Sequence, residues 1–249
     1  MKKLIFLIML VLAYSNSSSY IKDSLMLEMN DGIRLHTIIY KPTQQTAPLP
    51  AILIRTINGT DYFEQQVLEE FFINIVDLQN YILVLQDFRG RHKSEGAESF
   101  YRTEKQDGHE TIEWIAMQEW CDGKVAMWGY SALATAQYLA AASNPPHFVC
   151  GFPVFGAWNG YKDIAYRGGE FRKEVELWLK ENEVDSEVLD LIKQNSNYNQ
   201  SWDYFNLTSQ VNDINVPFFH TTGWYDGFLP SALDAYYQTQ FNGDRKSVV

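Results

Sequence analysis

Ser131 lies where an apolar strand is expected to turn sharply into a helix, within the run Trp128-Gly129-Tyr130-Ser131-Ala132-Leu133. Residues 124–128 are mostly apolar, as in a buried strand, and residues 132–142 are rich in the helix-favouring Ala and Leu. A serine at such a turn can hold its hydroxyl clear of the sheet, beside the N–H groups that begin the helix. Ser131 is therefore a candidate nucleophile. The alternative is a simple helix cap, since Gly-x-Ser-x-Leu is a weak pattern on its own.

Asp226 is the candidate acid partner of this serine. It lies in Gly223-Trp224-Tyr225-Asp226-Gly227, which follows the apolar segment 216–220, a predicted strand. Nucleophilic serines need a base, and the base needs an acid that orients it and stabilises its charge. An acid after a strand end, later in the chain than the serine, fits the order Ser, Asp, His.

Six segments, taken in order, resemble the Xaa-Pro dipeptidyl-peptidase-like (cocaine esterase–NonD) family of serine hydrolases. They are DGIRL at 31–35, QDFRGR at 86–91, DGHETIEW at 107–114, QEWCDGKV at 118–125, YRGG at 166–169 and GWYDGF at 223–228. The resemblance implies an α/β-hydrolase fold and the cleavage of an ester or amide bond through an acyl-enzyme. The substrate would be a small-molecule ester or a short peptide.

The resemblance also implies an oxyanion hole, formed by the backbone N–H of Ala132 and a donor from the loop after Arg55. Relatives often have a tyrosine there, in an Arg-x-Pro-Tyr stretch. Here Asn58 takes the tyrosine's place in Arg55-Thr56-Ile57-Asn58-Gly59. A side-chain amide can donate to an oxyanion. Equally, Asn58 and Gly59 can form an ordinary turn.

Three further departures from the family bear on the substrate. Ala132 replaces a usual tyrosine, Ala134 replaces a usual glycine, and Asn159 stands where many relatives have aspartate. If that aspartate binds a substrate ammonium group, its absence favours a plain acyl ester over an α-amino-acid ester or a dipeptide.

The family's catalytic histidine lies on a loop some tens of residues after the acid, whereas the sequence stops at Val249. We therefore expect a chain incomplete at its C-terminus, without the triad histidine, the last strands and the relatives' C-terminal β-sandwich. Residues 16–249 alone should then be inactive or poorly soluble. His92, after a strand end, is the nearest substitute base; the other histidines have ordinary structural interpretations: His36, His109, His147 and His220.

Apolar runs and helical patterns alternate along the chain. This alternation predicts a mostly parallel sheet with helices on both faces, and ligands bind at the carboxyl ends of such strands. The expected strands are 24–29, 33–40, 50–55, 81–86, 124–128, 148–155 and 216–220, and the expected helices are 63–79, 104–118, 132–142 and 231–240.

Residues 157–213 break the alternation and are interpreted as an inserted helical cap within the hydrolase domain, residues 20–249. Helices are expected at 170–182 and 186–194. Aromatic side chains could line an acyl pocket, or could only pack the cap onto the body. The candidates are Trp158, Trp202 and Tyr225, with Tyr161 and Trp178 as further possibilities.

Residues 1–15 have the pattern of a signal peptide. Two lysines precede a ten-residue apolar run, which is too short to span a bilayer, and small residues follow at cleavage spacing. This predicts a secreted or periplasmic protein without a stable membrane anchor, and the short leader suggests a bacterial source.

The formal charge of −11 argues against nucleic acid as a partner. No metal-ligand spacing is present, and we expect no cofactor. Cys121 and Cys150 are interpreted as two separate buried thiols in preference to a disulfide. Two alternative functions stay open, an Xaa-Pro dipeptidyl peptidase and a non-catalytic binding protein on the hydrolase fold.

Overall fold

The computed structural model describes residues 20–65 and 80–240. The predicted signal peptide lies outside these residues, as does most of the predicted helix 63–79. Near that helix the structure describes α2, Thr60–Phe63. Within the described ranges, no helix is long and apolar enough to cross a membrane.

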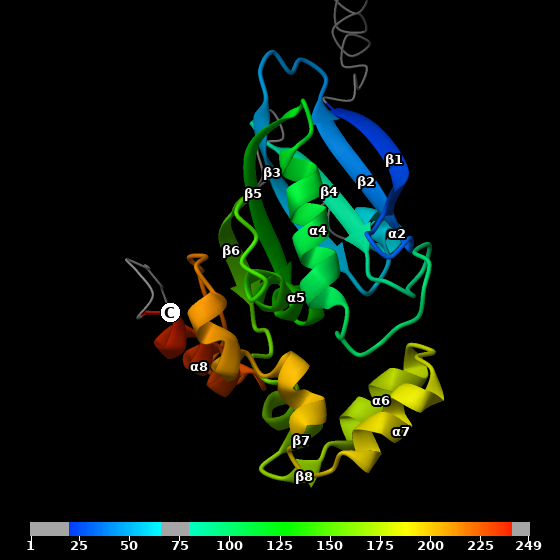
Figure 1. Ribbon diagram of the computed structural model, residues 1–249, viewed down its shortest axis with the longest axis vertical. Coiled ribbons are helices and arrows are strands. Elements are labelled where there is room, and N and C mark those ends of the chain that lie inside the picture. Colours follow the sequence, from blue (N-terminus) through cyan, green and yellow to red (C-terminus); the bar gives the residue numbers. More distant parts are fainter. Residues whose placement is uncertain (1–19, 66–79, 241–249) are drawn as a thin grey trace, which may run out of the picture.

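The described residues form a six-stranded sheet in the order β1-β2-β4-β3-β5-β6 (Figure 1). β1 and β2 form an antiparallel hairpin and β2 is antiparallel to β4, whereas β4, β3, β5 and β6 run parallel. The predicted α/β-hydrolase class is therefore confirmed. The strands are β1 Tyr20–Glu28, β2 Arg34–Pro42, β3 Leu49–Thr56, β4 Ile82–Asp87, β5 Cys121–Tyr130 and β6 Phe148–Val154.

Helices α4 (Glu104–Ala116) and α5 (Ala132–Ala141) cover one face of the sheet (Figure 1). Leu53 belongs to the core on that face, and its neighbour Ile54 belongs to a second core that includes Phe63 of α2. The alternation follows from the pleat of a strand, which sends successive side chains to opposite faces.

The predicted strand 216–220 is interrupted. It runs parallel to β6, and Phe219 N–H donates to the Gly151 carbonyl at 2.9 Å while Thr221 N–H donates to the Pro153 carbonyl at 3.1 Å. The intervening bond would need an N–H from Pro153, and proline has none. The ladder therefore reduces to isolated bridges at Phe218 and Thr221.

The segment between β6 and α8 (Leu229–Thr239) contains two α-helices, α6 (Lys173–Glu181) and α7 (Ser186–Gln194), beyond one end of the sheet (Figure 1). It also contains the π-helix η2 (Gly160–Ala165) and the short 3₁₀ helices η3 (Gln200–Phe205) and η4 (Leu207–Asp213). The prediction of a helix from Glu170 was wrong at its start. β7 (Tyr166–Arg167) and β8 (Glu170–Phe171) instead form a hairpin. Its turn is Gly168-Gly169, with φ of +66° and +85°, a conformation that glycine adopts without strain.

Both cysteines are free, but only Cys121 is buried. Cys150 is exposed, contrary to the prediction. It lies on β6, where Phe152, two residues along the same strand, is also exposed. Residues two apart in a strand share a face, so this part of the sheet is open to solvent.

Candidate active site

The turn between β5 and α5 presents Ser131 in a strained conformation. Ser131 has φ 55° and ψ −119°, outside the regions that most residues occupy. Its N–H donates to the Val154 carbonyl at 3.0 Å, which fixes the turn against β6. A Cβ on Gly129 would lie 2.4 Å from the Leu133 Cβ, so the sharp turn requires glycine there. Strain of this kind gathers at functional sites.

Ala134, three residues after the serine, packs closely against the segment after β6. It is fully buried, and a Cβ on Gly156 would lie 2.8 Å from the Ala134 Cβ. The methyl group at position 134 therefore fits because a glycine faces it.

Ser131 lines a cavity of about 360 Å³. The sheet end contributes one side, and the segment from β6 to α8 contributes the other. The lining residues are Ile57, Asn58, Phe100, Tyr101, Tyr130, Ser131, Ala132, Leu133 and Thr135 from the first, with Ile164, Arg172, Glu174, Val175, Trp178 and Phe228 from the second.

Three of the predicted site residues therefore meet in one cavity: Ser131, Ala132 and Asn58. Ala132 is the first residue of α5, and the first N–H groups of a helix have no acceptor within it. Among the described residues, neither the Ser131 hydroxyl nor the Asn58 side-chain amide has a hydrogen-bond partner. One residue with a free hydroxyl and two residues with potential oxyanion donors thus line the same cavity.

Asp226 lies beside this cavity and not in its lining. It is half-buried in the turn before α8, where its Oδ1 accepts the N–H of Phe228 at 2.6 Å. Phe228 itself lines the cavity, so Asp226 is two residues from the site.

Each of the five histidines interacts with a residue other than Ser131 and Asp226. His92 Nε2 donates to the Ile57 carbonyl at 3.0 Å, so this nitrogen is directed away from Ser131. The other contacts are His36 with Asp87, His109 with Ser143, His147 with Glu113, and His220 with Tyr138.

The three aromatic residues expected in the acyl pocket lie elsewhere. Trp158 is fully buried, with its ring 5.2 Å from that of Tyr138, and Tyr225 is fully exposed. Trp202 lines a second cavity of about 290 Å³. Residue type alone does not distinguish core from pocket. Trp178, a further possibility from the sequence, does line the Ser131 cavity.

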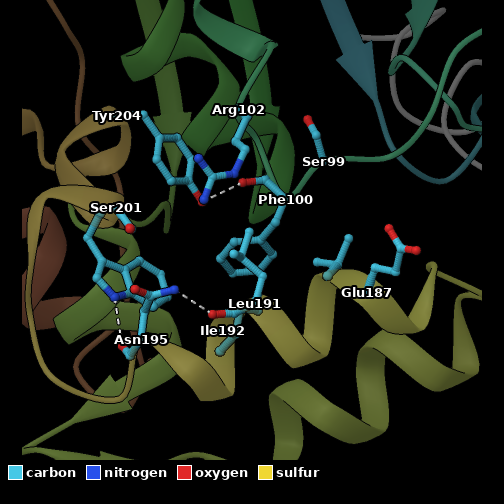
Figure 2. A pocket seen from close by; sticks show the side chains of 11 residues that line it. Ser99, Phe100, Arg102, Glu187, Leu191, Ile192, Asn195, Ser201 and Tyr204 are labelled. Atoms are coloured by element: carbon cyan, nitrogen blue, oxygen red, sulfur yellow. Dashed lines mark hydrogen bonds between the residues drawn. The ribbon is translucent and has the colours of Figure 1, made fainter.

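Phe100 is a site residue that the sequence did not indicate, and it separates the two cavities, since it lines both. Figure 2 shows Phe100 pointing toward α7, which carries Leu191 and Ile192. Its carbonyl accepts the hydroxyl of Tyr204 at 3.0 Å, and Arg102 stacks on the Tyr204 ring at 4.3 Å. Phe100 and Tyr101 both have positive φ, a conformation that no sequence motif signals.

Asn159 has a structural role. Its side chain accepts the N–H of Lys162 and donates to Asn206 Oδ1, both at 3.0 Å. It is buried and absent from the cavity lining. The charged residues of the lining are instead Arg172 and Glu174, whose Nε and Oε2 atoms are 3.9 Å apart.

A buried ionic network lies behind the site. Arg55, at the end of β3, binds Glu104 at 2.5 Å and Gln86 at 2.8 Å. Arg89 forms a two-bond contact with Asp107, at 3.0 and 2.6 Å. Burial raises the pKa of Glu104 to about 8, despite the attraction of Arg55. The network ties α4 to the strand from which the Asn58 loop emerges.

Known proteins share this fold and sequence pattern. Cocaine esterase of Rhodococcus sp. (strain MB1 Bresler) is 26% identical over 278 aligned residues, which cover 92% of this chain and 48% of the esterase. An α-amino acid ester hydrolase structure superposes with a TM-score of 0.75 at 19% identity, over 90% of this chain and 46% of that one. A CocE/NonD family hydrolase structure from Staphylococcus aureus superposes with a TM-score of 0.75 at 20% identity. The match covers 91% of this chain and 45% of that one.

The chain thus spans about half the length of cocaine esterase. The family model of the X-Pro dipeptidyl-peptidase (S15 family) matches it in two stretches, residues 31–180 and 170–249. These stretches contain Ser131, Ala132, Asn58 and Asp226. With the sheet order and the serine turn described above, they establish that the chain belongs to the X-Pro dipeptidyl-peptidase (S15) family of hydrolases.

Proposed function

We propose that this chain carries the nucleophile of an exported serine hydrolase whose substrates are plain acyl esters. The observation that supports this most directly is the strained Ser131 turn, which shares one cavity with the Ala132 N–H and the Asn58 amide. A nucleophile beside preorganised donors is the arrangement that acyl transfer requires.

In the proposed reaction, Ser131 Oγ attacks the ester carbonyl carbon and gives its proton to a histidine base. The oxyanion that forms is held by the Ala132 N–H and the Asn58 amide. The C–O bond to the leaving alcohol then breaks, and the alcohol takes the proton from the base. Water attacks the acyl-enzyme by the same route and releases the acid. Because none of the five histidines of this chain contacts Ser131 or Asp226, we propose that the base is supplied from outside these 249 residues, with Asp226 orienting it.

The charges of the cavity favour a neutral acyl group. Arg172 and Glu174 carry opposite charges at a separation of 3.9 Å, so neither sign dominates the lining. Asn159 is an amide and carries no carboxylate, and its side chain is bound to Lys162 and Asn206 outside the cavity lining. For a substrate ammonium group, as in an Xaa-Pro dipeptide, the lining offers the carboxylate of Glu174, which already pairs with Arg172.

The test is fluorophosphonate labelling of the full-length protein and its Ser131→Ala variant. We expect labelling of the parent and none of the variant, together with hydrolysis of a neutral 4-nitrophenyl ester. A folded full-length protein that is not labelled would favour a binding protein on the hydrolase fold. Faster cleavage of an Xaa-Pro anilide than of the aryl ester would favour the peptidase.

The proposal of export rests on residues 1–15. Its test is the N-terminal sequence of the protein recovered from the periplasm or medium of a bacterial host. Cleavage near Ser15 is expected, and an intact Met1 in cytoplasmic protein would contradict export.

A further inference from the structure

We propose that His92 is a positioning residue, which holds the loop that carries Asn58 so that the amide faces the Ser131 cavity. The expected effect of His92 on the rate of hydrolysis rests on the proposed function, whereas its contact with the loop does not. The contact that carries it is a hydrogen bond of 3.0 Å between His92 Nε2 and the carbonyl of Ile57, directly before Asn58.

The protonation of His92 follows from this contact. A carbonyl oxygen only accepts, so Nε2 must carry the proton and donate it. Neutral His92 is then the Nε2–H tautomer, with Nδ1 unprotonated. The tautomer is therefore a directly observable consequence of the contact.

Gly59 brings the loop against the ring. Gly59 has φ +93°, and a Cβ built on it would lie 2.9 Å from His92 Nδ1 and 3.0 Å from Cγ and Cε1. The backbone of residue 59 therefore packs directly on the imidazole. His92 contacts the loop on both sides of Asn58, through a hydrogen bond to residue 57 and through packing on residue 59.

Asp87 anchors the far end of the loop. Its Oδ1 accepts the N–H of Thr60 at 2.6 Å, and its Oδ2 is 3.3 Å from His36 Nδ1. At the near end, the Thr56 carbonyl accepts the N–H of Phe88 at 2.8 Å. The ends of the loop are thus fixed to β4 and the residue that follows it.

The middle of the loop depends on His92. The Asn58 N–H donates to the Thr56 hydroxyl at 3.1 Å, a bond within the loop itself. Among the described residues, His92 is the donor from outside the loop that bonds the Ile57 carbonyl, while the Ile57 side chain is buried in the core. The Ile57 peptide directly precedes Asn58 and therefore orients its side chain. Oxyanion donors act by being preorganised, so loss of this contact should slow the chemical step more than it weakens substrate binding.

The test compares His92→Gln with His92→Phe. Glutamine places Nε2 four bonds from Cα, as histidine does, and can donate to the same carbonyl, whereas phenylalanine keeps a ring and loses the donor. His92 is exposed and already has φ 50°, so both replacements should leave the fold intact and meet the same backbone requirement.

The first readout needs no activity. In the 249-residue chain, nitrogen-15 NMR should show the Nε2–H tautomer of His92. Hydrogen exchange at the Asn58 N–H should accelerate about tenfold or more in His92→Phe and stay near the parent rate in His92→Gln. The Nδ1–H tautomer, or unchanged exchange in His92→Phe, would overturn the proposal.

The second readout is the hydrolysis of a 4-nitrophenyl ester by the full-length protein. We expect His92→Phe to lower kcat about tenfold with little change in KM, whereas His92→Gln should keep kcat near the parent value. In the Asn58→Ala background, His92→Phe should lower kcat little further, because both changes affect the same donor. The positioning role would be overturned if His92→Phe were as fast as the parent or if His92→Gln were as slow as His92→Phe. Full additivity of the effects of His92→Phe and Asn58→Ala on kcat would also overturn it. If Ser131→Ala retains turnover, the proposed function fails, and hydrogen exchange alone then decides whether His92 holds the loop.

Discussion

Gly129 controls how Ser131 is presented. A methyl group at position 129 would lie 2.4 Å from the Leu133 Cβ, closer than any van der Waals contact allows. Either α5 must shift or the turn must open, and each would displace Ser131. We expect Gly129→Ala to lower the unfolding free energy by about 2–4 kcal/mol and to abolish fluorophosphonate labelling.

The matched control for Gly129→Ala is Gly223→Ala, since a Cβ there meets nothing within 4 Å. Urea denaturation should distinguish the two variants clearly. Equal stability of Gly129→Ala and the parent would contradict the requirement for glycine in this turn.

Some site residues could be predicted from the sequence and others could not. Ser131 and Ala132 could be identified because a strand-to-helix turn has a local signature, and Asn58 because it occupies a fixed place after Arg55. Trp158 and Tyr225 could not be placed. One lies in the core and the other in solvent, and this difference depends on contacts with distant segments.

At the scale of elements, Arg55 connects β3 with α4. Replacing Arg55 with methionine would leave Glu104 buried without its partner, because the two side chains are 0% and 3% exposed. Breaking a buried ion pair from one side costs about 3–5 kcal/mol, which we expect for Arg55→Met in chemical denaturation at a pH above the Glu104 pKa of about 8, where its carboxyl is ionised. Arg34→Met, which breaks the exposed Arg34–Glu95 pair on β2, should change stability little. If both variants lost a similar amount of unfolding free energy, burial would not be the reason for the cost of Arg55→Met.

Glu104 also predicts how stability depends on pH. Burial raises its pKa from 4.5 to about 8 in the folded chain. The folded state then holds this proton more tightly than the unfolded state, so the contribution to stability is complete below pH 4.5 and is lost as the pH rises toward 8. Each unit of pKa difference corresponds to about 1.4 kcal/mol. The pKa values of Glu98 and Asp163, also raised by burial, act in the same direction.

Urea titrations at several pH values between 5 and 8 check this dependence. Glu104→Gln cannot titrate, so its unfolding free energy should fall less steeply with pH than that of the parent, whatever the absolute difference between them. Parallel curves for the two proteins would show that Glu104 does not titrate in this range.

The order of the elements was predictable, because apolar strands and amphipathic helices have distinct periodicities. The exceptions have local chemical causes that a periodicity does not contain. Pro153 removes one ladder bond from the pairing of β6 with residues 216–221, and Gly168-Gly169 turns the expected start of a helix into a hairpin. Both causes are visible only once the pairing partner is known.

At the scale of the whole molecule, the site is assembled from segments far apart in the sequence. The Ser131 cavity joins the ends of β3 and β5 to α6 and the turn before α8. Phe100 lines this cavity and also the second cavity beside α7, which Figure 2 shows. Such long-range placement explains why the sequence indicated the nucleophile but neither Phe100 nor Arg172.

The open part of the sheet around β6 predicts how the chain behaves in solution. Val149 and Phe152 on β6 are 39% and 37% exposed, and Phe219 beside them is 42% exposed. The Phe152 and Phe219 rings contact each other, with centroids 4.8 Å apart, so they form one continuous apolar surface. Contiguous exposed apolar surface promotes association. We therefore expect residues 16–249 to self-associate through it, and Cys150 within it to form an intermolecular disulfide under oxidising conditions.

Light scattering against concentration tests this prediction, with Phe152→Thr/Phe219→Thr as the variant. Threonine favours extended backbone, so the double variant should keep the sheet and remain monomeric at concentrations where the parent associates. Met117→Thr is the control, because Met117 is 72% exposed but is the residue after α4 and does not lie on β6. Cys150→Ser should abolish the oxidised dimer without abolishing the reversible association, since the thiol only traps a contact that the phenylalanines create. If the double variant associates as strongly as the parent, or Met117→Thr is equally effective, the surface around β6 is not the site of association.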